Sequence, residues 1–427
     1  MRIALISAHC PVGPAARTSG ELPQPSSLAR ALAGQGHRVT LYTRCESQNL
    51  PRTAILSCRV SVEHVQAGPA RPLCDDQLAR HMPGFAAYLA DRWQSKRPDI
   101  VHAFSWTSGL AMLGAVRMLG AVRGADTPVV QTFESLGSTR RRLGGDESVS
   151  VGRIRLEAAI GRQADAVLAN STEEAAELAR LGVPKSAIQV VPCGVDTGVF
   201  AADGERAAKG AKHRLVVVAT QDRPLGLETV LRALAQVHDA ELIIAGGPDS
   251  KHLPRSGLFR DLAQLADALG VRSRVKFAGE VTGASLAALL RSADVAVSAS
   301  PYEPSGLAAL QAMACGTPVI VSGVGGHLDA VIDGTTGVLI APLDPAMLAR
   351  QLRKLLATPA LLEGYGIAAA DRARSRYDWE RIGGETLAVY QRLLTAKMPA
   401  PAAAEEEPDY LADAGYAEAD RAVAALA

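Results

Sequence analysis

Short apolar segments alternate with helical segments along most of this 427-residue chain, and that alternation limits the possible folds more than any other feature. Residues 2–7 (RIALIS) form an apolar run typical of a parallel strand that is buried on both faces. Residues 26–37 (SSLARALAGQGH) have helical spacing and end in glycines, and residues 38–44 (RVTLYTR) return to a strand pattern. This order predicts the start of a doubly wound α/β sheet.

The alternation occurs in two runs. Between them lies a polar segment rich in Gly and Ala, residues 190–213, which has the composition of a linker. The second run begins at residues 213–220 (HRLVVVAT) and closes near residues 318–323 (PVIVSG). We therefore predict two Rossmann-like α/β domains, residues 1–198 and 199–377, which bind ligands in the cleft at the carboxyl ends of their strands.

The charge and the cysteine content of the chain limit the kinds of binding partner and the cellular compartment that we expect. The 45 basic and 44 acidic residues give a formal net charge of +1, which provides no basic field for nucleic acid or a membrane surface. The six cysteines form no CxxC pair, so we expect reduced thiols in a cytoplasmic protein. No apolar run reaches the length of a membrane span. The Pro-, Ala- and Glu-rich tail, residues 396–427, is expected to be partly flexible. A homodimer is one open option.

Residues 302–326 (YEPSGLAALQAMACGTPVIVSGVGG) combine a loop, a helix of small residues, a buried strand and a glycine turn. A helix that starts at residues 304–306 turns free backbone N–H groups toward the cleft, and these favour an anionic ligand. Glu303 stands at that helix end, and Gln311 falls two turns along on nearly the same face. The pattern predicts an acid and an amide that hold two hydroxyl-bearing parts of one ligand; the alternative is a capped core helix with an exposed glutamate.

Residues 303–352 resemble the donor-binding region of family 4 glycosyltransferases, which have the GT-B fold. Further segments resemble the same family in the same order along the chain: residues 27–44, 97–111, 189–200, 292–306 and 376–394. The resemblance implies that the first domain binds an acceptor and the second binds a nucleotide sugar. It also implies that a final helix, residues 378–395, crosses back onto the first domain.

Members of this family transfer a sugar with retention of anomeric configuration and without a bound metal. The resemblance therefore implies a hexosyltransferase that uses a nucleotide-diphosphate sugar of the UDP or GDP type and needs no cofactor. His9, His102 and His327 lack the spacing of a metal site, so no metal ligands are predicted.

Several donor-site positions of the family match this sequence. Glu303 matches an acid that holds sugar hydroxyls near the anomeric carbon, whereas Gln311 stands where the family has a second Glu that grips the ribose. An amide can still accept one of those hydrogen bonds, without charge assistance. The other matched positions are the glycine loop beneath the phosphates, the backbone that reads the base and the helix start at the leaving group: Gly20, Glu280, Val281, Ser305, Gly306 and Leu307.

Two cations that the family uses against the diphosphate are missing. Their positions, aligned on the following glycine, hold Thr220 and Leu225. Transfer requires the leaving diphosphate to be stabilised as charge develops on it. Arg223 lies in the same loop and is the predicted substitute, with Lys251 or Arg255 as further options; each could instead be a surface cation.

Glu134 stands where the family often has a His that faces the reacting sugar. A carboxylate there could accept the acceptor proton, orient a cationic group of the acceptor, or repel the donor phosphate. It could also be a loop residue paired with one of the arginines at positions 140–142. We give Glu134 and Glu303 as the candidate catalytic residues.

Ser105, Ser135 and Arg153 are the predicted acceptor-binding residues. Family members that glycosylate inositol phosphate use a basic residue and a Tyr, which fall here at Cys74 and Ser105, whereas Arg153 matches their phosphate-binding Arg. The incomplete set argues against an inositol phosphate acceptor.

The leading hypothesis is a retaining glycosyltransferase with a small polar acceptor. The altered positions suggest a specialised enzyme of secondary metabolism. A rival hypothesis is a non-catalytic GT-B protein that acts as a binding or regulatory subunit. An epimerase on the same architecture fits less well, because the sequence lacks its acid and base pattern.

Overall fold

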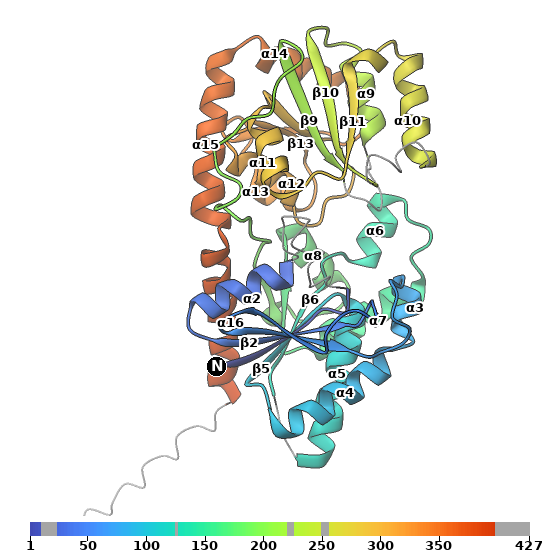
Figure 1. The fold of residues 1–427 in the computed structure, drawn as a ribbon, viewed down its shortest axis with the longest axis vertical. Coiled ribbons are helices and arrows are strands. Elements are labelled where there is room, and N and C mark those ends of the chain that lie inside the picture. Colours follow the sequence, from blue (N-terminus) through green and yellow to red (C-terminus); the bar gives the residue numbers. More distant parts are fainter. Residues whose placement is uncertain (10–23, 124–126, 220–225, 249–255, 398–427) are drawn as a thin grey trace, which may run out of the picture.

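The computed structural model describes residues 1–9, 24–123, 127–219, 226–248 and 256–397, and it has two α/β halves along its long axis (Figure 1). The first half contains an eight-stranded sheet in the order β3-β4-β2-β1-β5-β6-β7-β8. The second contains a six-stranded sheet in the order β11-β10-β9-β12-β13-β14. Neighbouring strands are parallel except for β3 and β4. The predicted pair of Rossmann-like folds is confirmed.

Each half alternates strands with helices. The strands are β1 Arg2–Ile6, β2 Arg38–Arg44, β3 Thr53–Ser57, β4 Val60–Val65, β5 Ile100–Phe104, β6 Val129–Thr132, β7 Ala166–Ala169, β8 Ile188–Val190, β9 His213–Ala219, β10 Ala240–Gly246, β11 Val275–Gly279, β12 Val295–Ser298, β13 Val319–Ser322 and β14 Gly337–Ile340. The described α-helices are α2 Gln24–Gly34, α3 Asp75–Ala79, α4 Met82–Ser95, α5 Trp106–Arg123, α6 Gly137–Gly144, α7 Val151–Gln163, α8 Thr172–Arg180, α9 Leu227–Leu234, α10 Gly257–Ala268, α11 Gly283–Arg291, α12 Leu307–Ala314, α13 Gly326–Ala330, α14 Pro345–Leu356, α15 Pro359–Tyr377 and α16 Trp379–Lys397.

Strand β1 illustrates why the central strands are apolar throughout. Ile3 and Leu5 pack in a cluster with residues of α2 and α16, whereas Ala4 and Ile6 pack on the other face with residues of α4 and α5. Successive side chains of a strand point to opposite faces, so a sheet covered by helices on both faces needs an unbroken apolar run. Residues 2–7 provide that run.

The C-terminal helix crosses back onto the first half, as predicted. Helices α15 and α16 follow one another along one side of the molecule (Figure 1), and Asp378 separates them. Asp378 forms a β-bridge with Val195, which marks the point where the two halves are joined a second time. Beyond it, Tyr390 is completely buried in the core of the first half, and its hydroxyl lies 2.7 Å from Nδ1 of His102.

The predicted linker is only partly exposed. Cys193, Val195 and Phe200 are each at most 3% exposed, and Phe200 packs in the core of the second half. Val195 and Phe200 thus belong to the core of the second half, and the role of the segment as a linker stays a prediction. The boundary between residues 198 and 199 stays a prediction. In the part of the chain that the structure describes, no helix combines the length and apolar character needed to cross a membrane.

Candidate active site

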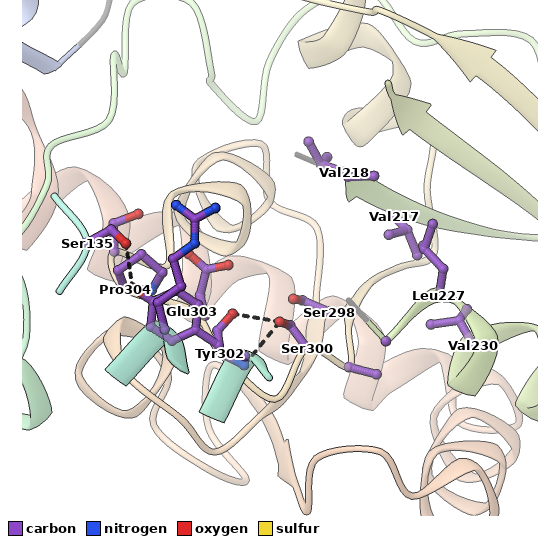
Figure 2. Close-up of a pocket in the computed structure, with 16 residues that line it drawn as sticks. Ser135, Val217, Val218, Leu227, Val230, Ser298, Ser300, Tyr302, Glu303 and Pro304 are labelled. Atoms are coloured by element: carbon purple, nitrogen blue, oxygen red, sulfur yellow. Dashed lines mark hydrogen bonds between the residues drawn. The ribbon is translucent and has the colours of Figure 1, made fainter. Parts of the chain in front are cut away.

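A cavity of about 250 Å³ opens between the two halves, at the carboxyl ends of strands β9 and β12. Figure 2 shows polar side chains of Ser135, Tyr302 and Glu303 on one side and an apolar wall opposite, which includes Val217, Val218, Leu227 and Val230. The remaining lining residues are Arg140, Gly144, Ala219, Gly226, Ser298, Ala299, Ser300, Pro304 and Ser305. We call this space the first cavity.

The start of α12 forms part of the polar side. Gly306 has a φ of 71°, in the left-handed region, and the helix begins at the next residue. One carboxylate oxygen of Glu303 accepts a hydrogen bond from Gly306 N at 3.0 Å, and Ser305 Oγ accepts one from Leu307 N at 3.3 Å. Glu303 therefore holds the turn that leads into the helix, and it also lines the cavity. A carboxylate has further acceptor capacity, so Glu303 can accept another hydrogen bond while it holds this turn.

The floor of the first cavity depends on Gly226. Its φ is 85°, and a Cβ placed there would lie 2.4 Å from the carbonyl oxygen of Ala299. Only glycine allows the backbone to approach β12 so closely. The loop before Gly226 carries the predicted cation Arg223 together with Thr220 and Leu225, and these lie outside the described residues, as do Gly20, Lys251 and Arg255.

Other predicted donor residues lie apart from the first cavity. Gln311 is 2% exposed, because α12 is covered on its inner side by the core of the second half. Glu280 and Val281 directly follow β11, and neither lines the first cavity in the described part of the chain. The predicted contacts of Gln311 with a ribose and of the two residues after β11 with a base stay predictions.

Hydrogen bonds hold the two halves together beside the first cavity. Tyr302 donates its hydroxyl hydrogen to Ser135 Oγ at 2.9 Å, and burial raises the pKa of the Tyr302 phenol well above its usual value, so it stays neutral. Thr172 donates its backbone N–H and its hydroxyl to the carboxylate of Asp329, at 2.7 and 2.8 Å. Ser135 is thereby fixed at the seam between the halves.

Arg140 of α6 lines the first cavity from the opposite half, and it is the only cation among the described residues that do so. Its Nε lies 2.7 Å from Oδ2 of Asp146, which is 1% exposed. A hydrogen bond from Ser148, assisted by the charge of Arg140, lowers the pKa of Asp146 and keeps it ionised. From the sequence, Arg140 was expected only as a possible partner of Glu134. The signal that could have revealed it is the run of three arginines at positions 140–142, in the segment that follows β6.

A second cavity of about 770 Å³ lies in the first half, and Ser135 and Arg140 line both cavities. Its walls come from the ends of β1, β5 and β6 and from α3, α5, α6 and α7. The other lining residues are His9, Leu73, Cys74, Asp75, Asp76, Ser105, Trp106, Phe133, Glu134, Asp146, Ser148, Val149, Ser150 and Arg153. The structure thus brings together Ser105, Ser135, Arg153 and Glu134, as the prediction of one acceptor site requires.

Glu134 sits just past the end of β6 with a φ of 50°, a conformation that few residues other than glycine adopt. Burial raises its pKa, the nearby His9 opposes this rise, and the carboxylate of Asp75 adds to it. The proposed pairing with arginines 140–142 is wrong. These arginines instead contact Asp146, the carbonyl oxygen of Val149 and the carboxylate of Glu177.

The guanidinium of Arg153 contacts two carboxylates, a backbone carbonyl oxygen and an aromatic ring. Its Nη1 lies 2.8 Å from Asp75, its Nε lies 2.7 Å from Glu157, and its Nη2 donates to the carbonyl oxygen of Ser135 at 3.1 Å. Its guanidinium also lies 5.7 Å from the ring centre of Trp106. Although burial opposes it, hydrogen bonding and charge from His9, with the charge of Arg153, lower the pKa of Asp75 to about 2.

Ser105 directly follows β5 and has a φ of 72°, and its hydroxyl lies 3.0 Å from Thr107 Oγ1 and 3.2 Å from Ser108 Oγ. Its main contacts are therefore with the first turn of α5. Among the described residues, no group of three or more His, Cys, Asp or Glu side chains is arranged to hold a metal ion.

Comparisons with known proteins identify the family. The family model described as Glycosyltransferase Family 4 matches residues 26–199, and the one described as Glycosyl transferases group 1 matches residues 203–372. A D-inositol 3-phosphate glycosyltransferase of Nocardiopsis dassonvillei is 32% identical over 397 residues, which cover 88% of this chain and 90% of that protein. One from Streptomyces scabiei is 34% identical over 384 residues, covering 85% of this chain and 84% of that protein.

Comparison with solved structures supports the same family. A sucrose-phosphate synthase from Thermosynechococcus elongatus has a TM-score of 0.79 and 29% identity, and the match covers 92% of this chain and 99% of that one. HepE of Anabaena, in complex with UDP-glucose, has a TM-score of 0.68 at 18% identity, covering 93% and 100% of the two chains, and supports the fold. The resemblance seen in the sequence is confirmed: the chain belongs to glycosyltransferase family 4 and has the GT-B fold.

Proposed function

We propose that this glycosyltransferase binds a UDP- or GDP-type sugar in the first cavity and a small polar acceptor in the second, and transfers the sugar with retention. The observation that carries the proposal is the shared wall: Ser135 and Arg140 line both cavities. A group transferred between two cavities must pass where they meet. The UDP-glucose complex of HepE, a protein of the same fold, supports a uridine nucleotide as the first donor to test.

The donor would lie along the polar side of the first cavity. The positive end of the α12 helix dipole, together with the Nη groups of Arg140, whose Nε contacts Asp146, would stabilise the negative charge that develops on the leaving diphosphate. Arg140 would thus take over from the cations that the family places in the loop before Gly226. Glu303 would accept hydrogen bonds from the sugar hydroxyls, and the apolar wall around Val217 and Leu227 would contact the nucleoside.

The acceptor hydroxyl would approach from the second cavity. In a front-face reaction its oxygen forms the new bond to the anomeric carbon while the bond from that carbon to the phosphate oxygen breaks. The proton of the hydroxyl passes to the leaving phosphate. Glu134, whose carboxylate faces the second cavity, would orient the acceptor.

Some finer expectations remain proposals. They are a role in secondary metabolism, a cytoplasmic location, a homodimer and the division at residues 198 and 199. The rival view, a non-catalytic binding subunit, predicts no turnover by the isolated protein.

The proposal is tested by thermal-shift measurements with UDP, GDP, ADP and TDP and their glucose conjugates, followed by assays of nucleotide release with a panel of polyol acceptors. A ligand of the folded state raises the midpoint of unfolding by mass action. We expect one nucleotide to raise it, and Glu303→Ala to abolish release while the nucleotide still binds. Absence of binding by all four nucleotides would overturn the proposal.

A further inference from the structure

The charges that line the second cavity do not balance. Four carboxylates line it, those of Asp75, Asp76, Glu134 and Asp146, against two arginines and one histidine. A further carboxylate, Glu157, lies directly behind the wall against Arg153. Residues 10–23, which the structure does not describe, contain one Arg and one Glu, so their formal charges cancel.

Each cation in the wall already faces a carboxylate. Arg140 contacts Asp146 at 2.7 Å. Arg153 contacts Asp75 and Glu157, and it is only 8% exposed. His9 Nε2 lies 3.0 Å from Oδ1 of Asp75. A phosphate group on the acceptor would have to displace these carboxylates or lie beside them, and a like charge at this distance is unfavourable.

Two carboxylates remain without such a partner. Within the described residues, neither Glu134 nor Asp76 forms a hydrogen bond or an ion pair. Both line the second cavity, where Asp76 is exposed and Glu134 is half-buried next to Ser135, a residue that also lines the first cavity. A positive charge placed between them would favour the ionised form of Glu134, whose pKa burial raises.

We infer that the acceptor carries a protonated amino group, and that Glu134 and Asp76 bind this group. This inference rests on the proposed function and names its acceptor class: an amino sugar or an aminocyclitol rather than a sugar phosphate. The ammonium has no free electron pair, so a hydroxyl of the same molecule is the nucleophile. The donor diphosphate beside the shared wall adds negative charge, which favours a cationic acceptor further.

Three matched cyclitols test the inference in binding experiments on the full chain with UDP present. They are scyllo-inosamine, myo-inositol and D-myo-inositol 3-phosphate, which differ in charge and little in shape. We expect scyllo-inosamine to bind at least tenfold more tightly than myo-inositol, with the phosphate weakest. Added NaCl should weaken binding of the amine and leave that of the neutral cyclitol unchanged.

Variants of the two carboxylates test the assignment. Glu134→Gln should weaken binding of the amine about 10- to 100-fold, the loss of one hydrogen bond between charged groups. Asp76→Asn, at an exposed position, should weaken it a few-fold, and neither variant should change binding of myo-inositol. Asp91→Asn, an equal change of charge on the exposed face of α4, is the matched control. Because Asp76 is exposed, its variant stays folded even if Glu134→Gln does not.

The inference is overturned if the amine binds no better than myo-inositol, including the case in which none of the three binds, or if the phosphate binds best. Either result leaves the proposed function standing as long as UDP or its sugar raises the unfolding midpoint. Failure of every nucleotide to bind would instead count against the proposed function.

Discussion

The two cavities that meet at Ser135 and Arg140 are built in different ways. The first is lined by backbone, small side chains and an apolar wall, with Glu303 and Arg140 as its only charged described residues. The second is lined by charged side chains from elements far apart in the chain, such as Asp75 and Arg153. What the first cavity can bind thus depends on how closely the backbone can approach a ligand, and what the second can bind depends on which charges are already paired.

The largest expected effect is that of Arg140→Ala. The proposed function gives Arg140 the role of stabilising the diphosphate, although Arg140 belongs to the first half. Loss of a preorganised group that stabilises the transition state costs about 10²- to 10³-fold in kcat. Steady-state assays of nucleotide release would measure it. Arg155→Ala, an exposed arginine on α7, is the matched control and should change nothing. Equal activity of the two variants would remove Arg140 from the donor site.

Glu174 of α8, at the seam between the two halves, should make stability depend on pH. Glu174 is 8% exposed; its Oε2 accepts from Asn170 N at 2.6 Å, and its buried Oε1 has no partner among the described residues. Burial raises its pKa from 4.5 to about 7, although Asn170 opposes the rise. The folded state therefore holds a proton that the unfolded state releases. Stability should fall by about 3 kcal/mol as pH rises from about 4.5 to 7, and stay level above.

Glu174→Gln removes the titrating group and keeps an acceptor for Asn170. Thermal unfolding at pH 5 and pH 8 would compare it with the wild type. The variant should gain stability relative to the wild type at pH 8 and not at pH 5. Parallel pH profiles of the two proteins would show that Glu174 does not titrate in this range.

A smaller effect is expected for Tyr302→Phe. This change removes the hydrogen bond to Ser135 and leaves the aromatic ring, at a cost of about 1 kcal/mol. Because the bond joins the halves beside the first cavity, KM for the donor should rise several-fold with little change in kcat. Tyr365→Phe, on α15 in the second half, is a control. A drop in kcat alone would place Tyr302 in the chemical step instead.

Asp75→Asn tests whether the paired charges of the second cavity decide what it binds. The change removes one of the two carboxylates that pair with Arg153 and leaves the other, that of Glu157. Asp75 is about one-third exposed, so the expected loss of stability is only about 1 kcal/mol. The partly released guanidinium should improve binding of D-myo-inositol 3-phosphate several-fold, while donor binding is unchanged. Calorimetric titration of both ligands would measure this, and unchanged affinity for the phosphate would contradict the explanation of the second cavity.

The difference between the two cavities, one built from local segments and the other from distant ones, also explains which features could be predicted from the sequence. Unbroken apolar strands are a local pattern, and they correctly predicted the two sheets. The loop before α12 is another local pattern; the structure places Glu303 and Ser305 of this loop at the first cavity, and their roles toward a donor stay predictions. The edge hairpin β3–β4 was not predicted, because β3 alternates between exposed and half-buried residues and has no apolar run.

Contacts between distant residues could not be predicted. Gln311 shares a helical face with the residues at the start of α12, but periodicity does not reveal that α15 covers that helix. Arg140 is one of three adjacent arginines, and only the fold shows which of them lines both cavities. The pairing of Arg153 with Asp75 likewise joins residues 78 positions apart.

Acceptor-dependent release of UDP from UDP-glucose, measured with and without scyllo-inosamine in the wild type and in Arg140→Ala, tests the central claim most directly. Two cavities that share a catalytic wall predict release that requires the acceptor and falls at least 100-fold in the variant. If UDP-glucose binds but no UDP is released with any acceptor, the result would contradict the claim and favour a non-catalytic binding subunit.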